Sequence, residues 1–480
     1  MKKFYITTPI YYVNARPHLG HAYTTIAADV LARYYRVKGW KVFFLTGTDE
    51  HGGKIEKAAE KMGKSPQQFC DENSERFKKV WQKLNISYDN FIRTTDPSHI
   101  KAVKRALQLL YKRDFIYKGI YKGLYCPGCE QYKTESDLKD GKCPDHQIKP
   151  EVIEEESYLF RLSRFEDVLK KKIENNDLKI EPEERKREVL KFLSQGLKDI
   201  SISRQKVKWG IRLPFDQRLT AYVWVDAFLN YLTGIGWEGD PKNIPDFWPP
   251  DVQLMAKDII RVHATIWPAL LLALGIPLPK RLFSHGYFTI EGQKMSKSLG
   301  NVIWPEEMID RFGVDGTRYL LISSCPFGQD GDISWQKMVK KYNADLAKGL
   351  GNLVSRILSL AERININSST NQNLSFQQIQ NAKLKKEVEN TWQNYKNLLE
   401  GLFLDKALIS IWTLISFCDK LIEKERPWEE SGKQQSVICD LLKALKNIAE
   451  MLQVFLPESS ERILEQIKRK KKEKPLFPKL

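Results

Sequence analysis

The first fifty residues carry the pattern that most constrains the fold, because an apolar run, a helical run and a second apolar run follow one another directly. Residues 4–13 are extended in character and largely apolar, and residues 22–38 place apolar side chains at steps of three and four, as one face of an amphipathic helix does. Gly39 ends that helix, and the run at 42–45 predicts a buried parallel strand. Strand, helix and strand in this order form a βαβ unit, so we expect an α/β domain built on a parallel sheet.

Each of the two expected strands ends in a polar turn. The first turn contains His18-Leu19-Gly20-His21, and the second, at residues 46–52, contains Asp49. Ligands of open α/β sheets bind outside the carboxyl ends of the strands, and a helix start such as the one after the first turn attracts anions. Two histidines and a glycine before a helix more often serve a turn and a cap. The first turn alone therefore does not establish a phosphate site.

Residues 114–222 interrupt the α/β pattern. Their first part, 116–125, is aromatic and punctuated by glycine, which is typical of hairpins rather than βαβ units. Two close pairs of metal-binding side chains follow, and they form a tetrahedral zinc set: Cys126, Cys129, Cys143 and His146. A redox pair is the alternative, but it would not need the second pair. We therefore expect one structural zinc ion that stabilises a small module. The charged run at 170–198 is expected to be helical and solvated.

The α/β pattern resumes after residue 222. Aromatic residues recur at helical spacing within 222–231, which usually indicates core packing, and residues 252–255 predict another strand. The loop Lys294-Met295-Ser296-Lys297-Ser298 is flanked by glycines. Its lysines and serines can hold a phosphate through charge and hydroxyl donors. An ordinary solvent loop is the alternative, and composition alone favours it.

From about residue 343 the chain is expected to be helical throughout, which predicts an antiparallel bundle. Apolar residues from Leu346 to Leu360 mark one long amphipathic helix, which Asn352 and Arg356 interrupt with polar groups. Arg426-Pro427-Trp428 lies in an expected turn, where a tryptophan beside a basic residue can stack on a base.

Composition limits the class of protein. A chain of 480 residues exceeds a single domain, and a formal net charge of +17 favours a polyanionic partner. No apolar run is long enough to span a bilayer, and Met1-Lys2-Lys3 leads into a strand-like segment rather than a signal-peptide core. Seven cysteines, an odd number, argue for a reducing compartment. We expect a cytoplasmic protein that does not enter the membrane.

His18-Leu19-Gly20-His21 and Lys294-Met295-Ser296-Lys297-Ser298 together, in this order and bracketing a divided α/β domain, resemble the paired signature of class I aminoacyl-tRNA synthetases. The chain most closely resembles the bacterial methionyl-tRNA synthetase family, over nearly its whole length. Further stretches carry the likeness, namely the Cys₃His knuckle and residues 10–21, 46–52, 222–231, 351–356 and 426–428.

The resemblance implies an α/β fold in which a Rossmann-type nucleotide-binding domain is split by a zinc-bearing insertion and followed by a C-terminal α-helical bundle. It divides the chain into the first half of the catalytic domain (1–113), a connective insertion (114–222) with its zinc knuckle at about 121–151, the second half (223–293), the KMSKS loop with a stem-contact region (294–342), and an anticodon-binding bundle (343–480).

The resemblance also implies a two-step reaction. Methionine and ATP give methionyl-adenylate and pyrophosphate, and the methionyl group is then transferred to the terminal ribose of methionine tRNAs, initiator and elongator. The implied catalytic residues are His18, His21, Lys294 and Lys297, with Tyr12, Gly20 and Ser296 also at ATP. The implied cofactors are Mg²⁺ with ATP and the one structural zinc.

The same resemblance implies the residues that bind methionine and the anticodon. The methionine site comprises Ile10, Tyr12, Asp49, Trp224, Ala227, Tyr231, Ile259, His263 and Trp267. The anticodon contacts are Asn352, Arg356 and Trp428. The sequence departs from the family at Gln253 and Ala256, where a histidine and a glycine are usual, which bears on ATP contacts there. The sequence ends at Leu480 without a further tRNA-binding domain through which some relatives dimerise, so we expect a monomer.

Two rival interpretations differ in class. Another class I synthetase is the first, but leucine and valine enzymes carry a large editing insertion, and cysteine enzymes need a metal at the substrate, whereas this cluster is complete without one. A catalytically silent tRNA-binding relative is the second. Such a protein would have little reason to keep both histidines, Asp49 and both loop lysines.

Overall fold

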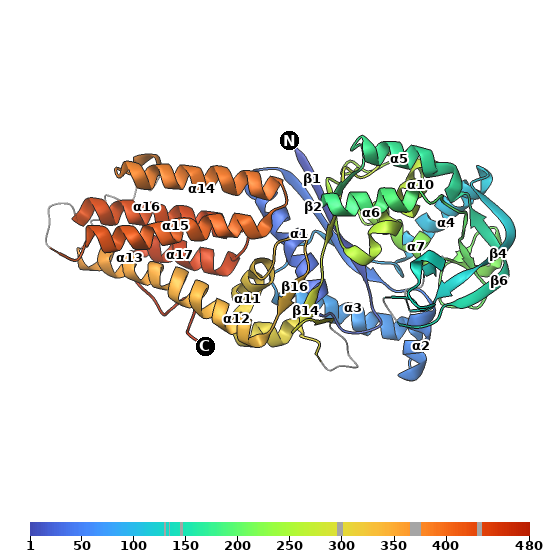
Figure 1. Ribbon diagram of the computed structural model, residues 1–480, viewed down its shortest axis with the longest axis horizontal. Coiled ribbons are helices and arrows are strands. Elements are labelled where there is room, and N and C mark those ends of the chain that lie inside the picture. Colours follow the sequence, from blue (N-terminus) through green and yellow to red (C-terminus); the bar gives the residue numbers. More distant parts are fainter. Residues whose placement is uncertain (129–130, 134, 145–146, 295–300, 365–375, 430–433) are drawn as a thin grey trace. The chain divides into compact units, whose positions relative to one another are not determined.

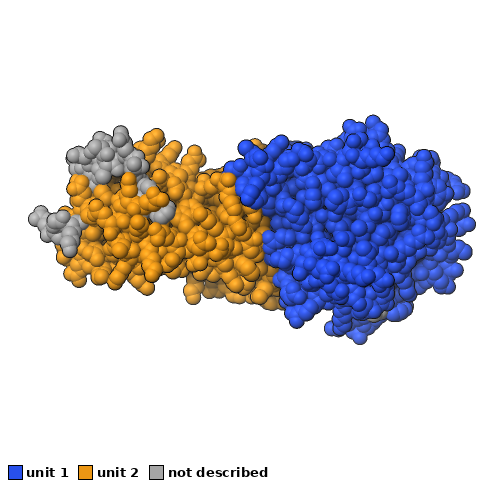
Figure 2. All heavy atoms as spheres, turned by 90° about the horizontal axis from the view of Figure 1, so that it is seen from above, with its two compact units in different colours: residues 1–17, 39–79, 87–284 blue, residues 18–38, 80–86, 285–480 orange. Residues whose placement is uncertain are grey.

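The computed structural model describes residues 1–128, 131–133, 135–144, 147–294, 301–364, 376–429 and 434–480. The chain forms two compact units (Figure 2). Unit 1 comprises residues 1–17, 39–79 and 87–284, and unit 2 comprises residues 18–38, 80–86 and 285–480. None of the helices in these ranges is long and apolar enough to cross a membrane.

Unit 1 is built on a six-stranded sheet with the order β3-β2-β1-β12-β13-β7. Its strands are β1 (Lys3–Tyr12), β2 (Lys41–Asp49), β3 (Asn90–Arg93), β7 (Lys179–Glu181), β12 (Val252–Ala256) and β13 (Arg281–His285). β1 pairs in parallel with both β2 and β12, and β2 pairs in parallel with β3. The expected α/β fold with a parallel sheet is therefore confirmed.

The helices of this part of the chain follow the strands and are largely apolar on one face. They are α2 (Gly53–Lys61), α3 (Pro66–Lys83), α4 (Pro97–Lys112), α5 (Glu166–Glu174), α6 (Glu183–Leu193), α7 (Val223–Phe228), α8 (Asn230–Thr233), α9 (Ile260–Ala264) and α10 (Ile266–Leu274), with short 3₁₀ turns at Glu135–Asp137, Leu162–Phe165 and Lys257–Ile259. One hydrophobic core joins the sheet to α4 and α10 through residues such as Leu45, Ala106 and Leu270.

The segment between α4 and α7 forms two small antiparallel sheets, as the hairpin pattern predicts. One has the order β5-β4-β6-β8 and the other β10-β11-β9. Their strands are β4 (Ile116–Cys126), β5 (Gln131–Lys133), β6 (Glu151–Phe160), β8 (Ile200–Ser201), β9 (Ser203–Arg204), β10 (Arg212–Leu213) and β11 (Asp216–Ala221). The expectation of a helical run over 170–198 is wrong in part, because β7 lies between α5 and α6 and pairs in parallel with β13 at the edge of the main sheet.

β1 is irregular just before its polar end. Its register with β2 shifts between Thr7 and Ile10, and Pro9, which has no N–H to donate, lies within the shift. Regular pairing then resumes, with Tyr12 opposite Asp49. Such irregularities re-aim the side chains that follow them. The last residues of β1, from Ile10 to Tyr12, therefore pair with β2 in a different register from the residues before them.

Unit 2 contains α1, a small sheet and the helical bundle (Figure 1). Its elements are α1 (Leu19–Val37), β14 (Phe288–Ile290), β15 (Gln293–Lys294), α11 (Pro305–Ser323), β16 (Gly331–Ile333), α12 (Trp335–Lys341), the π-helical η5 (Tyr342–Leu350), α13 (Gly351–Arg363), the 3₁₀ turn η7 (Phe376–Gln378), α14 (Ala382–Glu400), α15 (Leu404–Glu425), α16 (Gln434–Leu452) and α17 (Pro457–Arg469). The expected C-terminal bundle is confirmed, but its first long helix starts at Trp335 and changes to π-helical geometry over η5.

A buried arginine ties parts of unit 2 together. Arg318 of α11 is 1% exposed and donates to Asp29 Oδ2 of α1 at 2.7 Å. It also donates to the carbonyl oxygens of Leu84, Val454 and Phe455 at 3.2, 3.1 and 2.8 Å. The guanidinium thereby satisfies four acceptors on three separate segments of this unit.

Candidate active site

Asp49 is the last residue of β2 and lies opposite Tyr12 of the neighbouring strand. The Val13 N–H donates to the Asp49 carbonyl at 3.3 Å, so the residue that follows β1 is bonded to the last residue of β2. Gly47 is required nearby, because a Cβ there would lie 2.0 Å from the Ile92 carbonyl oxygen. Asp49, Ile10 and Tyr12 therefore come from one small region at the carboxyl end of the sheet.

An ion pair stiffens the turn after β2. The fully buried Glu50 accepts two hydrogen bonds from Arg93, at 2.7 and 2.9 Å, and one from Thr48 Oγ1 at 2.7 Å. A bidentate arginine–carboxylate pair fixes orientation as well as distance. Glu50 follows Asp49 directly, so the pair restrains the backbone that presents the Asp49 carboxylate.

The remaining residues expected at methionine lie in an aromatic cluster formed by α7 to α10. The His263 ring lies edge-on to Trp224, with centroids 6.2 Å apart, and Tyr231 packs on Trp267 at 5.6 Å. Ile10, Tyr12, Trp224 and Ile259 are partly buried against the core that contains Tyr231 and Trp267, and Ala227 is 6% exposed on α7. The structure brings these expected residues into unit 1.

His263 is neutral in this cluster. Its Nδ1 lies 2.9 Å from the Ile259 carbonyl oxygen, which can only accept, so Nδ1 carries the proton. Its Nε2 therefore accepts from the Tyr231 hydroxyl at 2.8 Å. Burial lowers the pKa of His263 to about 4. The cluster thus presents neutral rings at neutral pH, which suits an uncharged side chain of the substrate.

Sequence reasoning missed two members of this cluster. Phe228 packs between His263 and Trp267, at centroid distances of 4.9 and 5.7 Å, and its position one helical turn after Trp224 was the available signal. Gln253 is fully buried, and its Oε1 accepts from Trp267 Nε1 at 3.0 Å. The residue that departs from the family therefore contacts the aromatic cluster directly.

The histidines of the first motif form the cap of α1. The Gly20 N–H donates to His18 Nδ1 at 3.1 Å, the His18 N–H donates to His21 Nδ1 at 3.2 Å, and the two rings stack with centroids 3.7 Å apart. The helix consequently begins at Leu19, three residues before the start expected from apolar spacing. The same atoms that cap the helix place both imidazoles at its N-terminus, where the helix dipole favours anions.

The segment around the second motif lies in the same unit as α1. The Leu19 N–H donates to the Ile303 carbonyl at 3.3 Å, so the chain just after the loop contacts the first turn of α1. Lys294 ends β15, where it pairs with Thr289 of β14. Ser296 and Lys297 lie outside the described residues.

Asp332 of β16 anchors the hairpin that leads into this loop. Its carboxylate accepts from Lys337 Nζ at 2.6 Å, from the Gly292 N–H at 2.6 Å and from Thr289 Oγ1 at 3.0 Å. These bonds lower the pKa of Asp332 to about 2, and the bond from Lys337 contributes most. The base of the loop is therefore tied to β16 by an ionised carboxylate at neutral pH.

Half of the expected zinc set is described. Cys126 ends β4 and is fully buried, and Cys143 is fully buried between exposed neighbours. A tight turn surrounds Cys143, whose N–H donates to the Ile148 carbonyl at 2.9 Å and whose carbonyl accepts from the Gln147 N–H at 2.8 Å. Cys129 and His146 lie outside the described residues. Within the described part of the chain, no group of three or more histidine, cysteine, aspartate or glutamate side chains is placed so that it could hold a metal ion.

The residues expected at the anticodon lie on α13 and just after α15. Asn352 is exposed, and Arg356 follows it by one helical turn. Arg356 forms ion pairs with Asp419 at 3.3 Å and Glu423 at 2.5 Å, both on α15. Trp428 is 44% exposed. Of the residues expected at the anticodon, Trp428 therefore has an exposed ring that could stack on a base, whereas Arg356 is already held in ion pairs.

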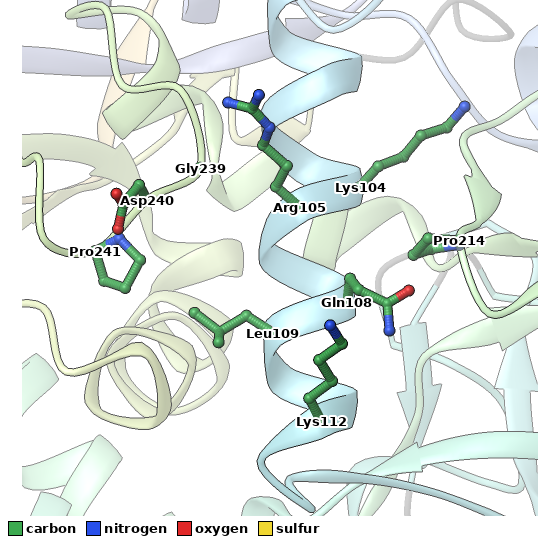
Figure 3. Close-up of a pocket in the computed structure, with 9 residues that line it drawn as sticks. All are labelled: Lys104, Arg105, Gln108, Leu109, Lys112, Pro214, Gly239, Asp240 and Pro241. Atoms are coloured by element: carbon green, nitrogen blue, oxygen red, sulfur yellow. The ribbon is translucent and has the colours of Figure 1, made fainter.

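A surface hollow of about 680 Å³ lies along α4, lined by Lys104, Arg105, Gln108, Leu109, Lys112, Pro214, Gly239, Asp240 and Pro241. In Figure 3, Arg105 and Leu109 of α4 point toward the side of Asp240 and Pro241, whereas Lys104 and Gln108 point toward the side of Pro214. None of the residues expected at methionine, ATP, zinc or the anticodon lines this hollow. The aromatic cluster and the two motifs, not this hollow, therefore remain the candidate site.

These features define a class. A parallel sheet whose first strand leads into a histidine-capped helix, with a lysine-bearing hairpin loop later in the chain, is the arrangement of a class I tRNA synthetase. The family model for tRNA synthetases class I (M) accordingly matches residues 4–149 and 134–358.

The particular family follows from the relatives. The chain is 44% identical over 474 residues to the methionine–tRNA ligase of Caldanaerobacter subterraneus subsp. tengcongensis, which covers 97% of this chain and 74% of the relative. It is 43% identical to that of Thermotoga maritima, over 97% of this chain and 75% of the relative. Mycobacterium tuberculosis methionyl-tRNA synthetase in complex with methionyl-adenylate superposes with a TM-score of 0.89 at 37% identity, covering 97% of this chain and 94% of the other. The chain belongs to the methionine–tRNA ligase family.

Proposed function

We propose that this chain joins L-methionine to methionine tRNA. Methionine and ATP react to give methionyl-adenylate and pyrophosphate, and the methionyl group then passes to the 3′-terminal ribose of initiator and elongator tRNAs with release of AMP. The observation that carries the proposal is the neutral aromatic cluster around His263, in the same unit as the Asp49 carboxylate. The relatives named methionine–tRNA ligase, and the similar structure that holds methionyl-adenylate, support it.

In the first step an oxygen of the methionine carboxylate attacks the α-phosphorus of ATP, and the bond to the β,γ-pyrophosphate breaks. The protein supplies no covalent nucleophile, so catalysis rests on alignment and on neutralising charge in the transition state. His18 and His21 bind the phosphates at the N-terminus of α1. Lys294 and Lys297 stabilise the leaving pyrophosphate. Mg²⁺ bound with ATP shares the neutralisation of phosphate charge.

Asp49 binds the ammonium group of methionine, and the aromatic cluster binds its side chain. A carboxylate supplies the opposite charge for an ammonium group, and sulfur packs favourably at aromatic ring edges. The edge-on placement of His263 against Trp224 and Phe228 supports this assignment, because it leaves the cluster rich in ring edges. Methionine is thus held at two ends, one charged and one neutral.

We also propose a structural zinc ion on Cys126, Cys129, Cys143 and His146. Thiolates and imidazole suit zinc, and the complete burial of Cys126 and Cys143 in a short, weakly apolar segment fits a metal-centred module. Elemental analysis of the full-length protein should find one zinc per chain, and Cys143→Ser should lose it. A folded, active protein without zinc would contradict this assignment.

Amino-acid-dependent ATP–pyrophosphate exchange tests the function. A panel of methionine, leucine, valine, cysteine and homocysteine should give efficient exchange with methionine. Homocysteine should support slow exchange, because it is shorter but also carries sulfur. Efficient exchange with another amino acid would identify a different synthetase. Folded protein that binds tRNA without any exchange would instead identify the silent relative.

A further inference from the structure

Three buried residues far apart in the chain meet in unit 1 and have no role in the reaction proposed above. Asp226 Oδ2 lies 2.6 Å from His51 Nδ1, and Asp226 Oδ1 lies 2.8 Å from His99 Nε2. The other nitrogen of His99 lies 2.7 Å from Thr233 Oγ1. Asp226, His51 and His99 are 1%, 5% and 0% exposed. One carboxylate thus binds two imidazoles away from water.

These residues join the two ends of the methionine site. Asp226 lies on α7 between Trp224 and Ala227, which belong to the expected side-chain pocket. His51 lies two residues after Asp49, the expected ligand of the ammonium group. Asp226 therefore links the turn that carries Asp49 to the helix that carries the pocket wall.

His99, the third residue of this cluster, connects Asp226 to the hydrophobic core of unit 1. His99 lies in the first turn of α4, a helix whose inner face belongs to the core of unit 1. His51 is further restrained by Trp209, which packs on its ring at 5.6 Å and donates from Nε1 to the Glu50 carbonyl at 2.6 Å. Neither imidazole can shift alone without breaking a buried contact.

The bonds to Asp226 are strong for a physical reason. Burial raises the pKa of the Asp226 carboxyl, but the charge and hydrogen bond of His51, followed by those of His99, outweigh burial and hold the pKa at about 2. The carboxylate is therefore ionised and accepts N–H bonds from both rings. Removing one donor from a buried carboxylate is costly, so the three groups keep a single arrangement.

We propose that Asp226 is a positioning residue for amino-acid recognition, which sets the spacing between Asp49 and the pocket wall on α7 by binding His51 and His99. The inference rests on the proposed function, because it needs a substrate held at both ends. A substrate bound at both ends is sensitive to that spacing, and an error of about 1 Å costs on the order of a hundredfold in rate. A substrate bound at one end is not.

Steady-state exchange kinetics with Asp226→Asn test the proposal. Asparagine has the same size, but its amide presents N–H groups to one of the two imidazoles. The KM for methionine should rise about tenfold or more, while the KM for ATP stays within about twofold. Asp246→Asn is the matched control, because Asp246 is an exposed aspartate of the same unit that pairs only with Lys3 at 2.6 Å among its described contacts. It should leave both constants unchanged.

A second pair of variants keeps the test independent of the folding of Asp226→Asn. His99→Gln retains a side-chain N–H that can reach Asp226 and should keep the KM for methionine near the wild-type value. His99→Leu removes that donor and should raise it. Thermal unfolding of each variant shows whether the protein measured is folded.

A truncated substrate separates positioning from general damage. The dissociation constant of 4-(methylthio)butanoate, which lacks the ammonium group, should be nearly the same for wild type and Asp226→Asn, whereas that of methionine should differ about tenfold. Equal losses for both ligands, equal rises in the KM for ATP and methionine, or no change in either Asp226→Asn or His99→Leu would overturn the proposal. If the wild-type protein gives no exchange with methionine, the proposed function itself fails, and the two failures are therefore distinct.

Discussion

Replacement of Gln253 by methionine tests how the aromatic cluster is held. Gln253 Oε1 is the acceptor for the buried Trp267 indole N–H at 3.0 Å, and its Nε2 lies 3.5 Å from Thr7 Oγ1. Methionine matches glutamine in length, so Gln253→Met leaves little empty space and removes mainly the strong acceptor. The variant therefore isolates the bond to Trp267.

The expected magnitude follows from that bond. Leaving a buried N–H without a good acceptor costs about 1–3 kcal/mol, and the contact to Thr7 is at the outer limit for a hydrogen bond and contributes little. The variant also no longer buries the polar glutamine amide, which offsets part of that cost. We therefore expect the free energy of unfolding to fall by about 1–2 kcal/mol. If the loss falls on the orientation of Trp267 in the methionine site, the KM for methionine should rise about 5- to 30-fold.

The assay is methionine-dependent pyrophosphate exchange with thermal unfolding in parallel. Gln217→Met is the control, because Gln217 is an exposed glutamine on β11, where its side chain donates to the Leu213 carbonyl. Gln253→Met should lower both the melting temperature and methionine affinity, and the control should alter neither. An unchanged KM together with an unchanged melting temperature would refute the reasoning that this bond holds Trp267.

Three further predictions concern charge and protonation. The pKa of His263 in the folded protein is about 4, below its unfolded value near 6.5, so stability is complete above about pH 6.5 and falls by about 3 kcal/mol as the pH drops toward 4. Urea unfolding at several pH values should show a shallower loss in His263→Asn than in the wild type. Lys297→Ala should slow adenylate formation by about 100-fold or more and leave methionine affinity nearly intact, as pre-steady-state kinetics would show; a collapse of methionine binding would contradict its role. Arg318→Met should lower the stability of unit 2 by about 3–5 kcal/mol, because Asp29 and three carbonyls lose a buried donor, and a loss below about 1 kcal/mol in urea unfolding would count against that account.

The sheet was predictable from the sequence because its central strands are short, continuous apolar runs. A strand buried on both faces needs such a run, and the runs in β1, β2 and β12 are read directly. β7 has only Ile180 as a buried residue between two charged ones. Charged residues are common on edge strands. The sequence of this three-residue strand therefore cannot be distinguished from the charged, solvent-exposed ends of the neighbouring helices. Its pairing with β13 depends on tertiary structure alone.

The candidate site likewise has features that the sequence shows and features that depend on tertiary structure. The two motifs and the ring stripe of α7 are local in sequence and could be recognised there. The start of α1 could not be placed, because histidine is an unusual capping residue and the cap depends on two rings stacking. The Asp226 cluster joins residues 51, 99 and 226, which share no periodicity. Only the fold brings them together.

The hydrogen bonds of the cluster also limit how well methionine can be recognised. The Tyr231 hydroxyl proton is directed to His263 Nε2, and the His263 Nδ1 proton to the Ile259 carbonyl, so neither is available to a substrate. Tyr231 and His263 can then distinguish sulfur from a methylene only by shape and by contacts with ring edges, each worth about 0.3–1.5 kcal/mol. At about 0.9 kcal/mol each, the middle of that range, two or three such contacts give about 2–3 kcal/mol, or a ratio of kcat/KM between methionine and norleucine of about 20 to 100. Discrimination beyond about 1,000-fold in the exchange assay would mean that a polar hydrogen reaches the sulfur, and that the hydrogen bond between Tyr231 and His263 is exchanged for one to the substrate.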